Sequence, residues 1–175
     1  HYISVTGGGG DLNFLSADNC PCCKADGIIS DGVNEMIKAV RTEIKYGSDW
    51  IKILATGAFM SSSTGVKDSP ENSHMSYEEI SICVEEAKRR KVPVMAHAHG
   101  ADGIKMAAEA GCRSIEHSSF IDEEGIDACL RMGCWIVPTF LIGAYFEESG
   151  SQSGAQDRMI LLQKANNLRY YECIS

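Results

Sequence analysis

The chain has 175 residues, of which 44% are hydrophobic and 23% are charged, and its formal net charge is −8. This size and composition are typical of one globular domain, and the acidic balance excludes a protein that binds nucleic acid through a basic surface. No apolar stretch approaches the roughly 20 residues of a membrane-spanning helix. We therefore expect neither nucleic acid nor a membrane as a partner. Scattered cysteines favour a reducing compartment, and we expect the cytoplasm.

The first part of the chain predicts a strand, a loop, a helix and a second strand. Residues 1–5 predict the first strand, and 6–30 predict a long loop rich in glycine and turn residues. A chain that starts within a strand suggests a piece of a longer protein. Asp31 is typical of a helix N-cap, apolar residues follow at helical spacing, and Gly47 marks the end of that helix. Residues 50–55 predict the next strand.

A second irregular segment, 56–74, separates this strand from a helix with a clear start signal. Ser76 and Glu79 have the spacing of a capping box, in which each side chain accepts a hydrogen bond from the other residue's backbone. The helix is expected to run to about Lys91. A strand at 93–98 follows it.

The alternation of strands and helices continues to the end of the chain. We predict helices at 101–110, 122–133 and 159–171, and strands at 113–117 and 134–140. Such alternation implies right-handed parallel crossovers, in an open doubly wound sheet or in an arc of a (β/α)8 barrel. A complete barrel takes roughly 250 residues, so a barrel would be partial here. No glycine-rich phosphate-binding motif follows any strand, which leaves nucleotide binding unsupported.

Three consecutive strands carry side chains that suit metal chemistry at or near their ends. Lys52 lies within an apolar strand, His97 and His99 end the next strand, and His117 ends the third. Alternate residues share a face, so the imidazoles of His97 and His99 point the same way. A single histidine at a strand end is more often structural. Because barrel active sites lie at the C-terminal ends of the strands, three such strands in a row favour a shared site.

The lysine is the least ordinary of these residues. Burying an ammonium costs on the order of several kcal/mol unless the group is paired or becomes neutral. A neutral lysine can form a Schiff base, or react with carbon dioxide to give a carbamate whose two oxygens can bridge cations. Histidine nitrogen and carboxylate-like oxygen suit zinc and similar divalent ions. The pattern therefore predicts a divalent-metal site with Lys52, His97 and His117 as ligands.

Four segments together resemble the amidohydrolase superfamily, in particular its imidazolonepropionase-like and Xaa-Pro dipeptidase (prolidase)-like branch. These segments are Trp50–Ile53, Ala96–Gly100, Ser114–His117 and Val137–Thr139. The resemblance covers about residues 2–141. It implies an α/β fold, a partial (β/α)8 TIM barrel with about strands 3 to 7 and their helices. Residues 1–175 would then be a fragment of a single metal-dependent hydrolase barrel domain.

The resemblance also implies roles for single residues. In this family the lysine that matches Lys52 is carboxylated and bridges two metals, zinc being the metal we expect, with two per intact site. The histidines that match His97 and His117 bind the second metal. His99 matches a position that is often His or Tyr, where we expect a supporting or substrate-contacting role, a structural role being equally open. Tyr145 is a candidate wall of the substrate site, and a plain loop position is equally open.

Three departures from the family pattern stand out. The His-x-His pair of the family's first strand and the aspartate of its eighth strand, the expected general base, are absent, and we expect both outside residues 1–175. The family's Thr-Gly-Gly-His-Gly-Asp also reads here with Gly9 in place of the histidine, close to where substrate would bind. The implied reaction is metal-dependent hydrolysis of an amide bond in a small amide, a dipeptide of the Xaa-Pro type or an N-acyl amino acid.

Alternatives remain at this point. The chain could be a non-catalytic α/β fragment or binding module, or an enzyme that uses Lys52 as a Schiff-base lysine. The cluster of Cys20, Cys22 and Cys23 could hold reduced thiols, a local metal or redox site, or a disulfide. A partial barrel exposes two sheet edges, so we expect it to associate with the remainder of its barrel or with itself.

Overall fold

The computed structural model describes residues 1–11, 27–59 and 69–149, and the statements below concern these residues. They form one six-stranded parallel sheet in the order β2-β1-β3-β4-β5-β6. The strands are β1 (Tyr2–Ser4), β2 (Ile28–Ile29), β3 (Ile51–Leu54), β4 (Val94–Ala98), β5 (Ser114–His117) and β6 (Trp135–Val137). The helices are α1 (Gly32–Lys45), α2 (Tyr77–Lys88), α3 (Ala101–Ala110), α4 (Glu123–Met132) and α5 (Phe140–Ser149).

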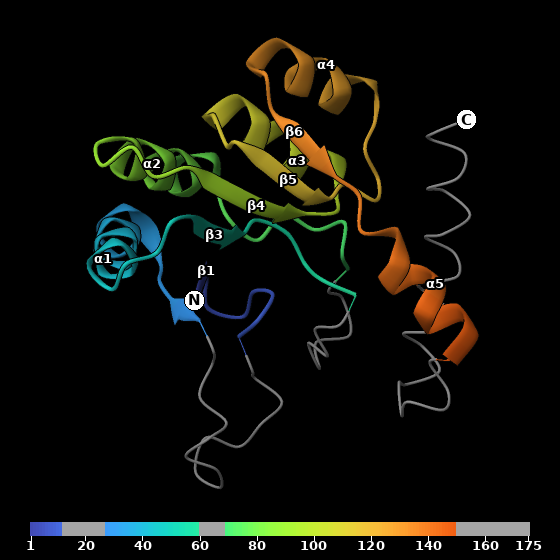
Figure 1. Ribbon diagram of the computed structural model, residues 1–175, viewed down its shortest axis with the longest axis horizontal. Helices are drawn as coiled ribbons and strands as arrows, with labels where there is room; N and C mark the ends of the chain where they lie inside the picture. Colours follow the sequence, from blue (N-terminus) through green and yellow to red (C-terminus); the bar gives the residue numbers. More distant parts are fainter. Residues whose placement is uncertain (12–26, 60–68, 150–175) are drawn as a thin grey trace, which may run out of the picture.

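The helices α1 to α4 form one layer against the sheet, and each packs on the next along the chain (Figure 1). Apart from β2, which pairs with the outer edge of β1, the strands cross the sheet in chain order. A doubly wound sheet would instead place helices on both faces and reverse its strand order. The fold is α/β, an arc of a (β/α)8 barrel, as predicted.

The predicted capping box of α2 is present in full. Glu79 N donates to Ser76 Oγ at 3.3 Å, and Ser76 N donates to Glu79 Oε2 at 2.8 Å. These two bonds satisfy backbone donors that the first turn of a helix leaves without partners. The helix ends at Lys88, slightly earlier than expected, and Lys91 takes a φ of 59° where the chain turns into β4.

Asp31 stands at the N-cap of α1 as predicted, but its side chain does not cap the helix. Its carboxylate instead accepts hydrogen bonds from Thr6 N at 3.0 Å and Thr6 Oγ1 at 2.6 Å. The hydroxyl bond is the main reason that the pKa of Asp31 lies below its usual value. This contact ties the segment that leaves β1 to the start of α1.

Two elements differ from the sequence prediction. The segment 6–30 was expected to be loop throughout, yet it contains β2, whose two residues are too few to give a periodic signal. The strand expected at 134–140 ends at Val137, and α5 begins at Phe140. Pro138 favours an extended conformation before it and donates no backbone hydrogen bond, which ends the strand. The apolar residues of α5 lack helical spacing, so no amphipathic pattern announced this helix.

Some predictions lie outside the described residues. They are the helix at 159–171, the Cys20, Cys22 and Cys23 cluster, and the parts of the two predicted loops at 12–26 and 60–68.

The hydrophobic core lies between the sheet and the helix layer. From the strands and their ends it contains Ile51, Ile53, Ala55, Val94, Ala96, Ala98 and Ile115. From the helices it contains Met36, Val40, Ile80, Cys83, Ile104 and Ala107. Side chains alternate along a strand, and these core residues face the helices. The residues between them, such as Lys52 and His97, therefore lie on the opposite face of the sheet, which we call the inner face.

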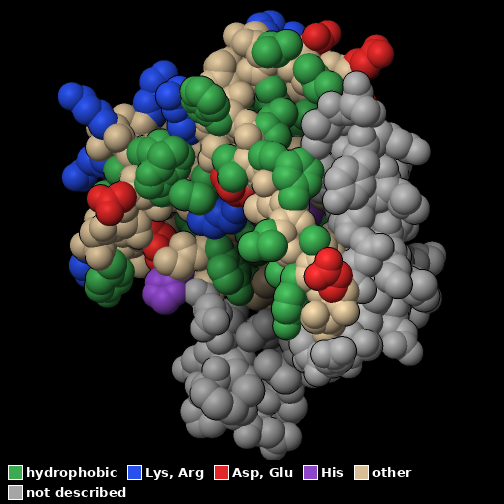
Figure 2. Space-filling model, turned by 45° about the vertical axis from the view of Figure 1, so that its right-hand side comes forward, with side chains coloured by type: hydrophobic (Ala, Val, Ile, Leu, Met, Phe, Trp, Pro, Cys, Tyr) green, Lys and Arg blue, Asp and Glu red, His purple; other side chains and the backbone are tan. Residues whose placement is uncertain are grey.

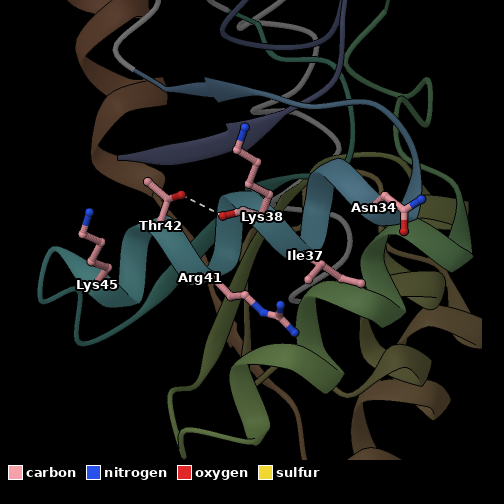
Figure 3. Close-up of a pocket in the computed structure, with 6 residues that line it drawn as sticks. All are labelled: Asn34, Ile37, Lys38, Arg41, Thr42 and Lys45. Carbon is pink, nitrogen blue, oxygen red and sulfur yellow. Dashed lines mark hydrogen bonds between the residues drawn. The ribbon is translucent and has the colours of Figure 1, made fainter.

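The outer surface of α1 is polar and basic. A shallow groove of about 490 Å³ runs along it, lined by Asn34, Ile37, Lys38, Arg41, Thr42 and Lys45 (Figure 3). Arg41 points from α1 toward α2, where Arg41 Nε lies 2.8 Å from Glu86 Oε1. This groove belongs to the helix layer, on the far side of the sheet from the inner face.

The β6–α5 end of the molecule differs in character. Its large apolar side chains are exposed: Trp135, Ile136, Val137, Phe140, Leu141, Ile142 and Tyr145. Figure 2 shows the side of the molecule on which many apolar side chains reach the surface. None of the described helices is long and apolar enough to cross a membrane.

Candidate metal centre

Three imidazoles meet at the C-terminal ends of β4 and β5. The ring centroids of His97 and His117 are 4.6 Å apart, those of His97 and His99 are 4.7 Å apart, and those of His99 and His117 are 4.8 Å apart. One nitrogen from each ring lies within 4.8 Å of the others. A divalent cation bound by histidine has nitrogen ligands at about 2.0–2.1 Å, so atoms this close to one another can share one ion.

The backbone explains how His117 joins the other two rings. Strand alternation puts His97 and His99 on the inner face, but His117 pairs in register with Ala98, which faces the helices. His117 and Ser118 depart from strand geometry, with φ values of 78° and 53°. This change redirects the side chain of His117 as β5 ends, and its ring lies against His97. Left-handed backbone at consecutive non-glycine residues is uncommon and is often found at functional sites.

Each ring is also held by one hydrogen bond to a neighbouring segment. The pairs are His97 Nε2 with Gly57 O at 2.9 Å, His99 Nδ1 with Ser119 Oγ at 2.6 Å, and His117 Nδ1 with Thr139 Oγ1 at 2.6 Å. Since a carbonyl oxygen only accepts, Nε2 of His97 carries the proton and Nδ1 carries the lone pair. Supporting bonds of this kind fix ring orientation at metal sites.

Burial keeps these imidazoles neutral. Removal from water is the main cause that lowers the pKa of His97 to about 3 and that of His117 to about 4, and the pKa of His99 is lowered for the same reason. The positive charges of neighbouring groups add to the effect. Neutral imidazole is the form that ligates a metal, so no proton would have to be displaced near pH 7.

Lys52 shares the inner face with His97. It pairs in register with Met95, which lies two residues before His97 on β4. Burial lowers the pKa of Lys52 to about 8, against the opposing effects of Glu116 and Cys112. The charge of Lys52 in turn lowers the pKa of all three clustered histidines, which places the lysine within electrostatic reach of the cluster. A neutral fraction near pH 7 is what carbamate formation requires.

Several supporting residues were not identified from the sequence. Thr139 was noted only as part of a matching segment, yet its hydroxyl bonds His117. Thr56 Oγ1 accepts a hydrogen bond from His99 N at 2.9 Å. A Cβ on Gly100 would lie 2.0 Å from Glu71 O, so only glycine lets the segment at 69–75 pass over this rim. The glycine after the histidines was visible in the sequence, but the segment that requires it was not.

Tyr145 lies on α5 and borders a different feature. A cavity of about 650 Å³ is lined by Pro138, Thr139, Phe140, Leu141, Ile142 and Tyr145. Thr139 belongs both to this cavity and to the support of His117. The predicted substrate wall therefore adjoins the histidine cluster through one residue.

Gly9, where the family pattern has a histidine, acts through its backbone. Ser4 Oγ donates to Gly9 O at 2.7 Å, and Gly9 N donates to Nδ1 of His74 at 3.0 Å. An imidazole from the segment before α2 thus accepts a hydrogen bond from the backbone of Gly9.

The sequence matches the model of the amidohydrolase family over residues 5–171. The chain belongs to the amidohydrolase family. Over 135 residues it is 38% identical to ochratoxinase from Aspergillus niger, a match that covers 77% of this chain and 27% of that protein. The chain thus spans about a quarter of the length of this curated relative.

Solved structures agree with this assignment. A prolidase in complex with N-methylphosphonate-L-proline is similar with a TM-score of 0.86 and 30% identity, over 99% of this chain and 43% of that one. A Xaa-Pro dipeptidase with methionine bound in its active site is similar with a TM-score of 0.81 and 30% identity, over 98% and 42% of the two chains. Both are amide hydrolases by name, and both are more than twice as long as this chain.

Proposed function

We propose that this chain carries the histidine part of a metal-dependent amidohydrolase site that cleaves the amide bond of a dipeptide, an Xaa-Pro substrate or an N-acyl amino acid. The convergence of three neutral imidazoles at the C-terminal rim of a parallel sheet carries the proposal. The relatives named prolidase and Xaa-Pro dipeptidase support the substrate class.

The donor set fits a divalent cation. Nδ1 of His97 and Nε2 of His117 are the nitrogens left by the hydrogen bonds to Gly57 and Thr139, and both rings are neutral near pH 7. We assign these two atoms as ligands, with zinc as the ion. His99 is close enough to join them or to contact substrate. Lys52, in its carbamate form, would supply oxygen ligands to the cations of the intact site.

The cations and the protein would have different roles in the reaction. When bound, the cations polarise the scissile carbonyl and make a water molecule more acidic. Gly57 and Thr139 hold the two ligand rings in place, and Phe59, whose ring contacts that of His99 at 4.6 Å, keeps solvent from one side of the cluster. A general base would come from a residue outside this chain, so we expect the isolated chain to turn over substrate weakly at best.

The exposed apolar residues of β6 and α5 suggest the protein partner. An edge strand with unpaired backbone groups and exposed Trp135 favours addition of another strand. We propose that the remainder of the barrel, or a second copy in its absence, covers this edge. Four described cysteines are free thiols, which suits a reducing compartment such as the cytoplasm.

Zinc binding by the purified chain tests the proposal. We expect stoichiometric zinc by calorimetry and elemental analysis, lost on His97→Ala or His117→Ala and weakened on Lys52→Ala. His1→Ala and Lys38→Ala are matched controls on the exposed surface and should bind as the wild type does. Bicarbonate should strengthen zinc binding by the wild type and have no effect on Lys52→Ala. A chain that binds no zinc at saturating concentrations would refute the site.

The lowered pKa of Lys52 also fits a Schiff-base enzyme, which would leave His97 and His117 without a chemical role. Borohydride reduction in the presence of an aldehyde or ketone substrate separates the two functions. Covalent trapping at Lys52 would favour the Schiff base, and its absence together with zinc binding would favour the hydrolase.

A further inference from the structure

Two cysteines meet at the turn where α4 ends and β6 begins. Gly133, with a φ of 64°, ends the helix, and Cys134 N donates to Cys129 O at 2.9 Å. This hydrogen bond around a left-handed glycine is that of the Schellman motif, in which the residue after the glycine commonly packs its side chain on the residue five positions earlier. Here both residues of that contact are cysteines, and both are free thiols.

Helix α3 ends in the same way and shows what is special about α4. Gly111 has a φ of 96°, and Cys112 N donates to Ala107 O at 3.0 Å. The residue paired with this cysteine is therefore an alanine. Burial raises the pKa of Cys112 to about 12, so its thiol stays protonated and unreactive. The turn after α4 has the same backbone arrangement, with a second thiol where α3 has a methyl group.

The second thiol changes the chemistry of the pair. A hydrogen bond between the two thiols lowers the pKa of Cys129 and raises that of Cys134. The pair therefore loses its first proton more easily than a single buried thiol does. Cys129 is 3% exposed, whereas Cys134 is only partly buried and is open to a small oxidant. The thiol of Cys134 also has Trp135 O as a weak acceptor, at 3.8 Å.

We propose that Cys129 and Cys134 form a reversible disulfide, with oxidised glutathione or a similar small disulfide as the oxidant. The Cys134 thiolate attacks one sulfur of oxidised glutathione, whose sulfur–sulfur bond breaks, and one glutathione thiolate leaves. Cys129 then attacks the sulfur of Cys134 and displaces the second glutathione. The two cysteines give up two electrons and two protons, and two molecules of reduced glutathione carry them away. In reducing compartments, disulfides are usually transient in this way.

The disulfide would fasten β6 to the helix that precedes it. The cross-link closes the segment 129–134, which contains the whole turn between the two elements, and Trp135 directly follows as the first residue of β6. Closing a loop removes open conformations of the chain, so the turn should open less often in the oxidised form. The inference uses neither the histidine cluster nor a metal, and it does not depend on the proposed hydrolase function.

Peptide mapping of the purified chain tests the proposal. Trypsin cleaves after Arg131, so Cys129 lies in peptide 114–131 and Cys134 lies in peptide 132–158. The chain is equilibrated with rising ratios of oxidised to reduced glutathione, its remaining thiols are blocked, and the digest is analysed by mass spectrometry. We expect these two peptides to become joined in one product, which dithiothreitol separates again. Amide hydrogen exchange at Cys134 should be about tenfold slower in the oxidised chain.

Alanine variants identify the sulfurs that react. Cys129→Ala and Cys134→Ala should each abolish the joined product. Cys112→Ala is the matched control, because this cysteine follows a helix-ending glycine in the same geometry, and the variant should form the product as the wild type does. The mapping of the wild-type chain does not require any variant to fold.

Three results would overturn the proposal. One is a wild-type chain that carries only glutathione on Cys134, since Cys129 would then be unable to reach it. Another is a product that joins Cys134 to Cys112 instead. The third is a joined product with unchanged amide exchange at Cys134, which would show that the cross-link does not hold the turn.

Discussion

Strands β5 and β6 are neighbours in the sheet, and each carries an isoleucine at a paired position, yet their environments are very different. Ile115 of β5 and Ile136 of β6 pair in register, yet Ile115 is 0% exposed and Ile136 is 37% exposed. β5 lies between two strands and beneath α3, whereas β6 forms one edge of the described sheet. The local sequence makes both segments strands, but the neighbours decide how much each buries. The histidine cluster lies on the buried side of this boundary.

The difference has consequences for where function can reside. The ring of His97 is hydrogen-bonded to Gly57 and that of His117 to Thr139, so both rings are oriented by the protein itself. Beyond β6, Leu141 is 83% exposed and Trp135 is 64% exposed. Apolar surface of this kind is typical of an interface. One end of the molecule thus holds the buried cluster to which we assign the reaction, and the other exposes the apolar surface that we assign to a partner.

The largest expected effect comes from replacing the paired isoleucines of β5 and β6 by alanine, one at a time. Ile115→Ala should lower the free energy of unfolding by about 2–5 kcal/mol, because it opens a cavity in a filled core. Ile136→Ala removes the same atoms from a partly exposed site and should cost less than about 1.5 kcal/mol. Urea denaturation of both variants gives the comparison. Similar losses would mean that β6 is as well packed as β5.

Acid should destabilise the folded chain through the histidine cluster. The folded pKa values of His97 and His117, about 3 and about 4, lie below the ordinary value near 6.5. At a pH between the folded and the ordinary values, the unfolded chain therefore binds more protons than the folded chain. The contribution of the two neutral imidazoles to the free energy of unfolding is therefore fully present above pH 6.5 and is lost as the pH falls toward 4. Each imidazole costs about 1.4 kcal/mol per pH unit in this window.

Urea titrations of the metal-free chain at pH 7.5, 6.0 and 5.0 measure this slope. His117→Asn should make the slope shallower by one proton relative to the wild type. A stability that is flat between pH 7.5 and 5.0 would contradict the burial of the cluster.

A smaller effect is expected at the junction between the two regions. Thr139 follows β6 and bonds Nδ1 of His117, so Thr139→Val should weaken zinc binding by about 10- to 100-fold while the ligands stay in place. Thr42→Val is the matched control, because that hydroxyl bonds only Lys38 O on the surface of α1 (Figure 3). Calorimetric zinc titration compares them. Equal affinities would show that the hydroxyl of Thr139 does not orient the ring.

The smallest expected effect is a gain. Within the described part of the chain, Ser118 Oγ is buried without a hydrogen-bond partner, and the residue has a φ of 53°. Ser118→Gly removes both costs and should stabilise the chain by about 0.5–1 kcal/mol. Ser119→Gly should destabilise instead, because Ser119 bonds His99. Thermal unfolding measures both, and a loss of stability in Ser118→Gly would contradict the assigned strain.

The spacing of hydrophobic residues and the cap residues of the helices were sufficient to predict most of the fold. The order from β3 to β6 and the capping box at Ser76 follow from local patterns that tertiary packing only reinforces. Missed were β2, which is too short to show a pattern, and α5, whose apolar residues have no helical spacing. These elements depend on neighbours that a local pattern does not contain.

The candidate site shows the same limit. Strand alternation brought His97 and His99 together, but it would have turned His117 toward the helices, and only the positive φ at the end of β5 redirects that ring. The contact between Gly9 and His74 joins residues 65 positions apart, and the sequence carries no signal for it. Hydrogen bonds between residues so far apart in the chain become visible only in the folded structure.

X-ray absorption at the zinc edge, with one equivalent of zinc on the purified chain, tests the central claim most directly. Ligation by the imidazoles of His97 and His117 predicts a nitrogen and oxygen shell at about 2.0–2.1 Å with the outer-shell scattering of histidine rings. A sulfur shell at about 2.3 Å would contradict it, because that distance would assign the ion to cysteines and leave the histidine cluster without a metal.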